Sequence, residues 1–248
     1  MSDAPPRLDL NCDLAEGEPA ERTAALMAEV TSANIACGGH AGNEHSMRHA
    51  VRLALQGGVR LGAHPGLPGH FGRRPVIGLS QAEFLELLHV QVARLGAIAA
   101  AEGGRLHHVK LHGALYHATE RQPALRDALV DFMTATCPGT VVYALAAGRT
   151  VAAARAAGLT AWDEAFADRG YRTDGSLVPR DQPQALLLDP GAISARVTAL
   201  ALGRPIATTD GPPLHLPTST LCMHGDAPNS ITLLRAARAA LQAASART

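Results

Sequence analysis

The chain repeats one pattern, a short apolar stretch followed by a helix-like run, and this repetition limits its fold more than any other feature. The seven apolar stretches lie at about residues 8–13, 33–37, 59–64, 107–112, 140–145, 160–164 and 220–224. The runs between them carry helix signals, with a capping-box sequence at 80–83 and Gly-Gly pairs at 57–58 and 103–104. Seven consecutive strand–helix units predict a parallel sheet. Because no linker or shift in composition divides the 248 residues, we expect residues 1–248 to form a single domain.

The strands alternate in polarity, and this alternation separates a closed barrel from an open sheet. Successive strand residues point to opposite faces, so Asp9, Asn11 and Asp13 of LDLNCDL share one face. The same parity applies to the polar residues at other strand ends, which are His64, Lys110, His112 and His224. Strands covered by helices on both sides are normally apolar throughout, whereas a barrel can direct polar groups to its axis at the C-terminal mouth. We therefore predict a seven-stranded (β/α) barrel, with an eighth strand or an open sheet as alternatives.

Three connections are longer than the others. They cover residues 64–78 after the third strand, 164–180 after the sixth, and 205–217 before the seventh. The last contains Asp210-Gly211, a pair typical of hairpin turns. The first two follow the C-terminal ends of strands, where α/β barrels place their active sites. We expect the functional site at that end of the barrel.

Lys110 is the only lysine of the chain, and all the other residues among the 22 basic ones are arginines. It lies in HVKLHGALYH, residues 107–116, on the polar face of its strand. A buried ammonium group needs a compensating charge. A structural ion pair with Asp9 or Asp13 would provide one, and a functional site with a ligand would provide another. The convergence of several polar strand ends favours the functional site.

Composition and charge argue against several classes of protein. The 22 basic and 22 acidic residues balance, aromatic residues make up 3%, and no basic run occurs, so nucleic acid is not an expected partner. The N-terminal MSDAPPRLDL lacks the pattern of a signal sequence, and no segment approaches the ~20 apolar residues that span a bilayer. We therefore expect a cytoplasmic protein without membrane contact. The cysteines lack CxxC spacing, which indicates reduced, packed side chains at Cys12, Cys37, Cys137 and Cys222.

Six motifs occur in the same order as in the LamB/YcsF family: DLNCDLAEGE, SANIACGGHAGN, GAHPG with FGRRP, VKLHGALY, EAFADRGYRTDGSLVPR and CMHGDAPNS. The chain resembles that family from about residue 8 to residue 235, although Ala15 stands where the family has Gly. The resemblance implies a (β/α) barrel related to the glycoside hydrolase/deacetylase barrels. It also implies one component of a multisubunit, ATP-dependent 5-oxoprolinase, which opens 5-oxo-L-proline to L-glutamate with ATP and Mg²⁺. Two other subunits are then the expected partners.

This chemistry gives the polar residues hypothetical roles. If the lactam oxygen is phosphorylated, ring opening needs a base for water, cations for the anionic groups and an acid for the ring nitrogen. We expect Asp13 or Glu164 to position the water and Lys110 to neutralise developing charge. The expected proton carriers are His64, His112 and His224. The expected substrate-binding residues are Asn11, His40, Arg169, Arg180 and Asp226, with the two arginines as bidentate partners of a carboxylate or phosphate.

The sequence lacks the common phosphate-binding motifs. A P-loop needs Lys after Gly, but Val109 precedes Lys110, and no G-x-G-x-x-G follows an expected strand. We therefore expect partner subunits to bind or hydrolyse the ATP. Nucleotide binding at the barrel mouth through Arg and backbone amides is the alternative.

Two other classes of function stay open. In a metal-dependent deacetylase or sugar hydrolase, a divalent metal would be bound by Asp13, His40, His64 and His112. In a non-catalytic subunit, the barrel would present 5-oxoproline or a similar small lactam to a partner enzyme. His45 and His49 stand four residues apart but lack an acidic partner, so we interpret them as surface residues.

Overall fold

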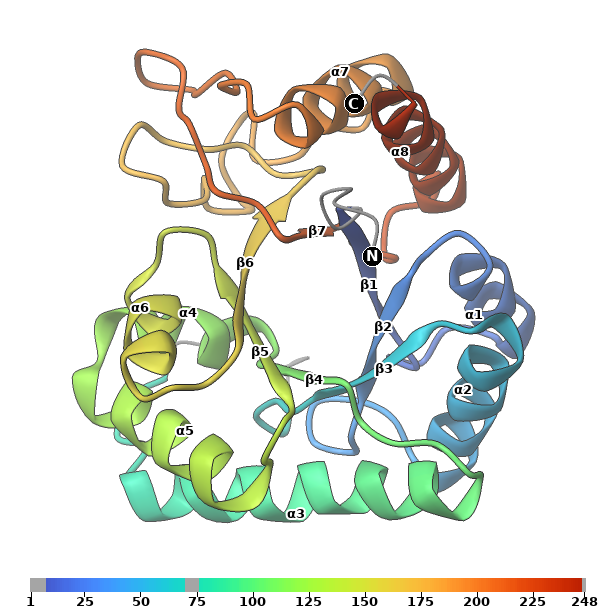
Figure 1. Cartoon of the computed structure of the whole chain (residues 1–248), viewed down its shortest axis with the longest axis vertical. Coiled ribbons are helices and arrows are strands. Elements are labelled where there is room, and N and C mark those ends of the chain that lie inside the picture. The colour runs from blue at the N-terminus through green and yellow to red at the C-terminus, as the bar shows by residue number, and fades with distance from the viewer. Residues whose placement is uncertain (1–7, 70–75, 247–248) are drawn as a thin grey trace, which may run out of the picture.

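The computed structural model describes residues 8–69 and 76–246, and its strands form one closed parallel barrel (Figure 1). Each strand pairs with the next along the chain, and the last pairs in parallel with the first. The strands are β1 (Asp9–Leu14), β2 (Ser32–Ala36), β3 (Arg60–His64), β4 (His108–Lys110), β5 (Val141–Leu145), β6 (Ala161–Phe166) and β7 (Thr220–Cys222). The predicted seven-stranded (β/α) barrel is confirmed. The alternatives, an open sheet or an eighth strand, are wrong for the described residues.

Helices surround the barrel, as the expected strand–helix repetition requires (Figure 1). They are α1 (Ala20–Met27), α2 (Glu44–Gly57), α3 (Gln81–Ala101), α4 (Gly113–Arg121), α5 (Pro123–Thr136), α6 (Arg149–Ala156), α7 (Pro190–Ala201) and α8 (Ser230–Ser245). The predicted capping box is present at the start of α3, where Ser80 and Glu83 bond reciprocally. Helix α2 ends at Gly58, whose φ of 64° is the left-handed conformation that glycine adopts without strain.

Two of the three long connections contain antiparallel bridges. Ile206 and Leu214 exchange two backbone hydrogen bonds of 2.9 Å, so the connection before β7 forms the expected hairpin around Asp210-Gly211. The connection after β6 contains a second antiparallel bridge, between Tyr171 and Leu177. His70 and the FGRRP motif lie outside the described residues.

Helix α3 corrects one expectation from the sequence. By length and composition this 21-residue helix is apolar enough to cross a membrane, although no segment was expected to approach that length. In the fold it lies against the outside of the barrel, and 39% of its most apolar window is buried. Phe84, Leu88 and Leu95 on its inner face are fully buried. Packing against β3 and α5 therefore accounts for much of its apolar character.

The N-terminal end of the barrel interior is a hydrogen-bond network around Asp9. This carboxylate is buried, forms an ion pair of 3.1 Å with Arg60, and accepts hydrogen bonds from the hydroxyls of Thr31, Ser32, Tyr143 and Thr220. Buried polar groups are tolerated when each one has a partner. Asp9 thus serves to join β1 with four neighbouring parts of the barrel, far from the mouth.

Replacing Asp9 with Ala is expected to lower the free energy of unfolding by about 3 kcal/mol or more, because Arg60 and several buried hydroxyls lose their acceptor. Denaturant titration followed by circular dichroism measures this loss. The matched control is Asp127→Ala, which alters an exposed aspartate on α5 and should change stability by less than about 0.5 kcal/mol. Equal losses in the two variants would contradict the structural role of Asp9.

Candidate functional site

A pocket of about 860 Å³ opens at the C-terminal end of the barrel. Its walls come from the ends of the strands, from α4 and from the connection after β6. Eight of the residues expected in the site line it: Asp13, His64, Lys110, His112, Arg169, Arg180, His224 and Asp226. The other three, Asn11, His40 and Glu164, are buried in the wall or floor. The structure thus brings the expected residues together at one mouth.

Lys110 lies between two carboxylates at the floor of this pocket. Its Nζ is 3.0 Å from Asp13 Oδ1 and 3.1 Å from Glu164 Oε1, and it also lies 3.0 Å from the sulfur of Cys222. Burial by itself would lower the pKa of Lys110, but Asp13, Cys222 and Glu164 raise it well above its usual value. The ammonium therefore stays charged. Of the two structural ion pairs considered from the sequence, the one with Asp13 forms, whereas Asp9 pairs with Arg60 at the other end of the barrel.

Asp13 connects this charge to the barrel interior. Its Oδ1 accepts a hydrogen bond of 2.8 Å from the Asn34 amide, which also donates to Asn11. The Asn34 carbonyl oxygen therefore faces His108 Nε2 at 2.7 Å, so that this nitrogen must donate. Burial lowers the pKa of His108 well below its usual value, which keeps the ring neutral. A fixed chain of donors thus orients Asp13 towards Lys110.

Glycine at position 62 makes this chain possible. A Cβ atom at Gly62 would lie 1.9 Å from His108 Nε2, so the inward position on β3 must be free of a side chain. His108 then stacks on Tyr143 with ring centroids 3.9 Å apart. Sequence reasoning missed His108, although it has the same strand parity as Lys110.

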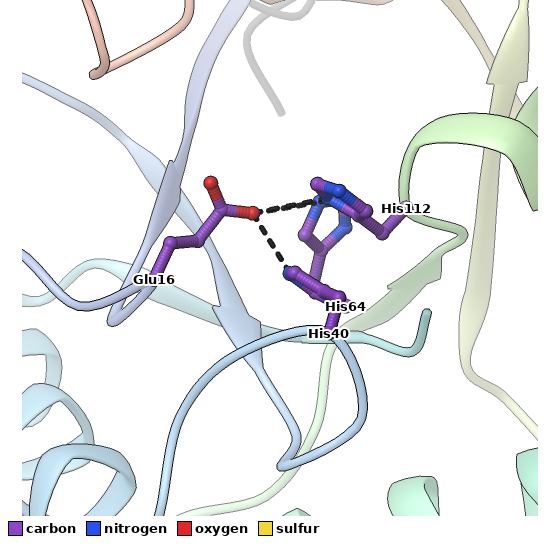
Figure 2. Close-up of side chains that lie close together, drawn as sticks. All are labelled: Glu16, His40, His64 and His112. Atoms are coloured by element: carbon purple, nitrogen blue, oxygen red, sulfur yellow. Dashed lines mark hydrogen bonds and ion pairs between the residues drawn. The ribbon is translucent and has the colours of Figure 1, made fainter. Parts of the chain in front are cut away.

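A second cluster is formed by Glu16, His40, His64 and His112 (Figure 2). It lies beside the Lys110 group, because His64 Nε2 is 3.3 Å from Asp13 Oδ2. Glu16 Oε1 is 2.9 Å from His40 Nε2 and 3.0 Å from His112 Nδ1. His64 Nε2 is 2.9 Å from His112 Nδ1 and 3.7 Å from Glu16 Oε1. The residues follow or end four successive strands, β1 to β4, and Figure 2 shows their side chains converging on one point.

In this cluster the negative charge lies on the Glu16 carboxylate. Burial would raise the pKa of Glu16, but hydrogen bonds from His112 and His40 lower it well below its usual value. Burial lowers the pKa of His40 to about 4, so its ring is neutral at physiological pH. Burial would lower the pKa of His64 as well, but the nearby Asp13 carboxylate, whose Oδ2 lies 3.3 Å away, raises it.

Glu16 is a residue that sequence reasoning missed. It lies two residues beyond the end of β1, where strand parity no longer predicts side-chain direction. The preceding Ala15 has a φ of 61°, in the left-handed region, and is the position at which the resembling family has Gly. This turn places Glu16 where it reaches the histidines. The signal in the sequence that could have identified Glu16 was its position inside the motif DLNCDLAEGE.

Another part of the site is an aspartate–histidine pair, of which His224 was expected from the sequence and Asp168 was not. His224 Nδ1 lies 2.9 Å from Asp168 Oδ2, which also accepts a hydrogen bond from the His224 backbone. Because a carboxylate only accepts, Nδ1 carries the proton and leaves Nε2 for exchange with a ligand. Burial would raise the pKa of Asp168, but His224 lowers it. Asp168 follows Glu164 by four residues in the motif EAFADRG, but its position in a connection gave no parity signal.

The two expected anion-binding arginines differ in availability. Arg169 is buried, and its Nε and Nη2 donate to the carbonyl oxygens of Ala185 and Val178. Its guanidinium group therefore stabilises the connection after β6. Arg180 instead forms an ion pair of 2.7 Å with Asp226. Both partners of this pair are partly exposed, at 29% and 43%. The two residues expected to bind substrate thus bind each other across the mouth.

The expected inert cysteines and surface histidines mostly fit the structure. All four cysteines are buried and unpaired by disulfides. Of the two histidines expected at the surface, His45 is exposed and His49 is partly buried. Burial lowers the pKa of His117, which also lines the pocket, to about 4. Cys222 was expected only to pack, yet its sulfur contacts Lys110.

Comparison with known proteins agrees with this geometry. Residues 8–248 match the LamB/YcsF family. The chain belongs to the LamB/YcsF family. This LamB/YcsF chain is similar to a lactam utilization protein from Thermus thermophilus, with 37% identity and a TM-score of 0.89 over 96% of this chain and 97% of that one. It also shares its fold with a family 4 carbohydrate esterase from Streptomyces lividans, with 16% identity and a TM-score of 0.50 over 96% of this chain and 88% of that one. The expected likeness to deacetylase-type barrels is therefore confirmed for the fold.

Proposed function

We propose that this chain is the barrel subunit of an ATP-dependent 5-oxoprolinase, which opens the lactam ring of 5-oxo-L-proline to give L-glutamate. The observation that carries the proposal is the 37% identity with a lactam utilization protein over 96% of the chain. The family match supports it. The polar pocket supports it too, since it offers a buried cation, carboxylates and histidines next to one another. ATP chemistry and a small metabolite make the cytoplasm the expected location.

The reaction consumes one ATP and two water molecules. Transfer of the γ-phosphoryl group to the lactam oxygen produces ADP and makes the ring carbon electrophilic. The first water adds to that carbon, and the C–N bond then breaks as the ring nitrogen takes up a proton. The resulting acyl phosphate is hydrolysed by the second water to glutamate and phosphate. The barrel must therefore supply charge stabilisation and two sites of proton exchange.

The pocket residues suit these tasks to different degrees. Asp13 lines the pocket and is oriented by Asn34 and Lys110, so it is suited to positioning water. Lys110 places a permanent positive charge beside it. Glu164 is fully buried, and its carboxylate balances the charge of Lys110 through an ion pair. His224, held by Asp168, is the histidine best placed to exchange a proton outside the Glu16 cluster.

The substrate carboxylate has a natural partner at the mouth. An exposed ion pair contributes only about 0–1 kcal/mol, so a substrate carboxylate can displace Asp226 from Arg180 at small cost. Arg180 would then bind the carboxylate with two parallel hydrogen bonds. Asn11 lies below the floor and bonds to Glu164 and Thr220, so its role is to orient Glu164 and not to touch substrate.

Phosphorylation is assigned to two partner subunits. The only lysine of the chain is 2% exposed and lies between two carboxylates, where it cannot reach the phosphates of ATP. Partner subunits that bind ATP and Mg²⁺ and pass on the activated lactam fit this arrangement.

The test is an assay of glutamate release from 5-oxoproline, ATP and Mg²⁺. The pure chain and the partner subunits alone should each release no glutamate, and the mixture should release it with stoichiometric ADP. Turnover by the isolated chain would contradict the division of labour. A mixture that makes no glutamate would contradict the lactam function.

Two further assays test the other candidate functions. Deacetylation of an N-acetylated sugar by the isolated chain would indicate a deacetylase of the same barrel type. A mixture whose turnover is unchanged when pocket residues are replaced would indicate a non-catalytic binding subunit. Both results would contradict the roles given to Asp13 and Lys110.

A further inference from the structure

The Glu16 cluster has the composition and spacing of a metal site. It offers three imidazole nitrogens and one carboxylate oxygen, all within 4.8 Å of one another. Tetrahedral ligands bound at about 2.0–2.1 Å lie about 3.4 Å apart. The four measured separations, 2.9, 2.9, 3.0 and 3.7 Å, lie on both sides of that value. Small side-chain shifts would therefore give a tetrahedral set.

The tautomer of one ring is already fixed for coordination. His64 Nδ1 lies 2.8 Å from the backbone carbonyl oxygen of Lys110, which can only accept, so Nδ1 carries a proton. In the neutral ring the lone pair of Nε2 then points towards His112 Nδ1 and Glu16 Oε1. A backbone carbonyl behind a ligating histidine is a common feature of metal sites, because it fixes the ring and raises its basicity.

Without a cation the cluster is hard to satisfy. Three histidine rings crowd one carboxylate, and the rings of His40 and His112 are stacked with centroids 3.6 Å apart. Protonating all three would place like charges in contact, whereas neutral rings require His40 Nε2 and His112 Nδ1 both to donate to the single oxygen Glu16 Oε1. A divalent cation bound by the four converging atoms removes this conflict.

A second group of potential ligands, Asp13, Cys222 and His224, is a weaker candidate. The Lys110 ammonium lies 3.0 Å from both Asp13 and Cys222 and so already occupies the place of a cation there. Asp13 was expected from the sequence to be a ligand together with the three histidines. In the structure Glu16 contributes the carboxylate oxygen of this group of four residues, and Asp13 contacts His64 without belonging to the group.

We propose that Glu16 Oε1, His40 Nε2, His64 Nε2 and His112 Nδ1 bind one divalent transition-metal ion of the Zn²⁺ class. Three nitrogen donors and one carboxylate suit Zn²⁺ or Co²⁺ better than Mg²⁺, which prefers oxygen ligands and several waters. Glu16, His64 and His112 line the pocket, so an ion has a path of entry. It would supply a Lewis acid beside Lys110. The inference does not depend on the lactam reaction.

The experiment measures metal binding to the isolated chain without substrate. The protein is stripped with a chelator, dialysed against Zn²⁺ or Co²⁺, and assayed for bound metal and for the visible absorption of low-coordinate Co²⁺. We expect one ion per chain. Zn²⁺ at 100-fold above its Kd should raise the Tm by about 5–10 °C.

Variants locate the ion. Each of three single variants, Glu16→Gln, His40→Ala and His64→Ala, should weaken metal binding at least ~100-fold, which is more than the loss of an outer-sphere partner causes. Glu16→Gln keeps the size of the side chain. His45→Ala, which removes an exposed histidine from α2, is the matched control and should leave affinity unchanged. Circular dichroism of each metal-free variant shows whether it is folded.

Three results would overturn the proposal. They are the absence of stoichiometric binding, affinity unchanged in folded Glu16→Gln, and an equal loss of affinity in His45→Ala. None of them bears on glutamate release, so the metal site and the lactam function can fail independently.

Discussion

Replacing Lys110 with Met is expected to lower glutamate release by the reconstituted complex at least ~100- to 1,000-fold, the range seen when one charge-stabilising group is removed from an active site. The variant keeps most of the length of the side chain but removes the only positive charge within 3.1 Å of both Asp13 and Glu164 among the described residues. Negative charge that develops on the lactam or phosphate would then face two carboxylates. Steady-state turnover at saturating 5-oxoproline measures the effect.

The same change should also destabilise the fold, because two buried carboxylates lose their partner, at a cost on the order of 3–5 kcal/mol. Two further variants separate this loss from the loss of activity. The double variant Lys110→Met/Glu164→Gln removes one charge of each sign and should recover much of the stability but none of the turnover. Arg155→Met removes the cation of another ion pair, with Asp163 on β6, and should leave turnover within a few-fold of normal. Recovery of turnover in the double variant would remove Lys110 from the mechanism.

Asp13→Asn is expected to reduce turnover by a similar factor, ~100- to 1,000-fold, while leaving the fold cooperative. The amide keeps the shape of the carboxylate and can still accept the hydrogen bond from Asn34 through its oxygen. Lys110 keeps its pair with Glu164 at 3.1 Å. What the variant loses is the negative charge that we propose positions water at the pocket wall. We therefore expect kcat to fall much more than KM rises.

Asp163→Asn is the matched control for this variant. Asp163 is a buried aspartate that, like Asp13, is paired with a basic residue, at 2.6 Å from Arg155. It does not line the pocket. The control should lose stability without losing turnover. If the two variants lost turnover equally, the effect of Asp13→Asn would be one of folding and not of chemistry.

The barrel was predictable because its signals are local. A strand has a period of two residues, so the polar alternation of LDLNCDL and HVKLH was visible without any tertiary information. Capping residues such as Ser80 and Glu83 act within one turn of a helix and were equally readable. Parity also indicated that Asp13, His64 and Lys110 would share one mouth, and the closed barrel places them there.

The partners of these residues were not predictable in the same way. Glu16 and Asp168 lie beyond strand ends, where a turn and not the strand period sets the direction of the side chain. Arg169 was expected to bind anions because it lies in a loop near the mouth, but its hydrogen bonds hold that loop in place. Loop conformation depends on contacts distant in sequence, which a local pattern does not contain.

The sequence by itself predicted seven strands, their parity, and most of the charged groups at one end of the barrel. The tertiary structure alone decided which of these groups neutralise each other. Closure of the sheet places Lys110 of β4 against Asp13 of β1 and Glu164 of β6, and it gathers Glu16 with three histidines from four successive strands. The reason is that electrostatic interactions depend on distance and burial. Both become defined only when the first and last strands pair.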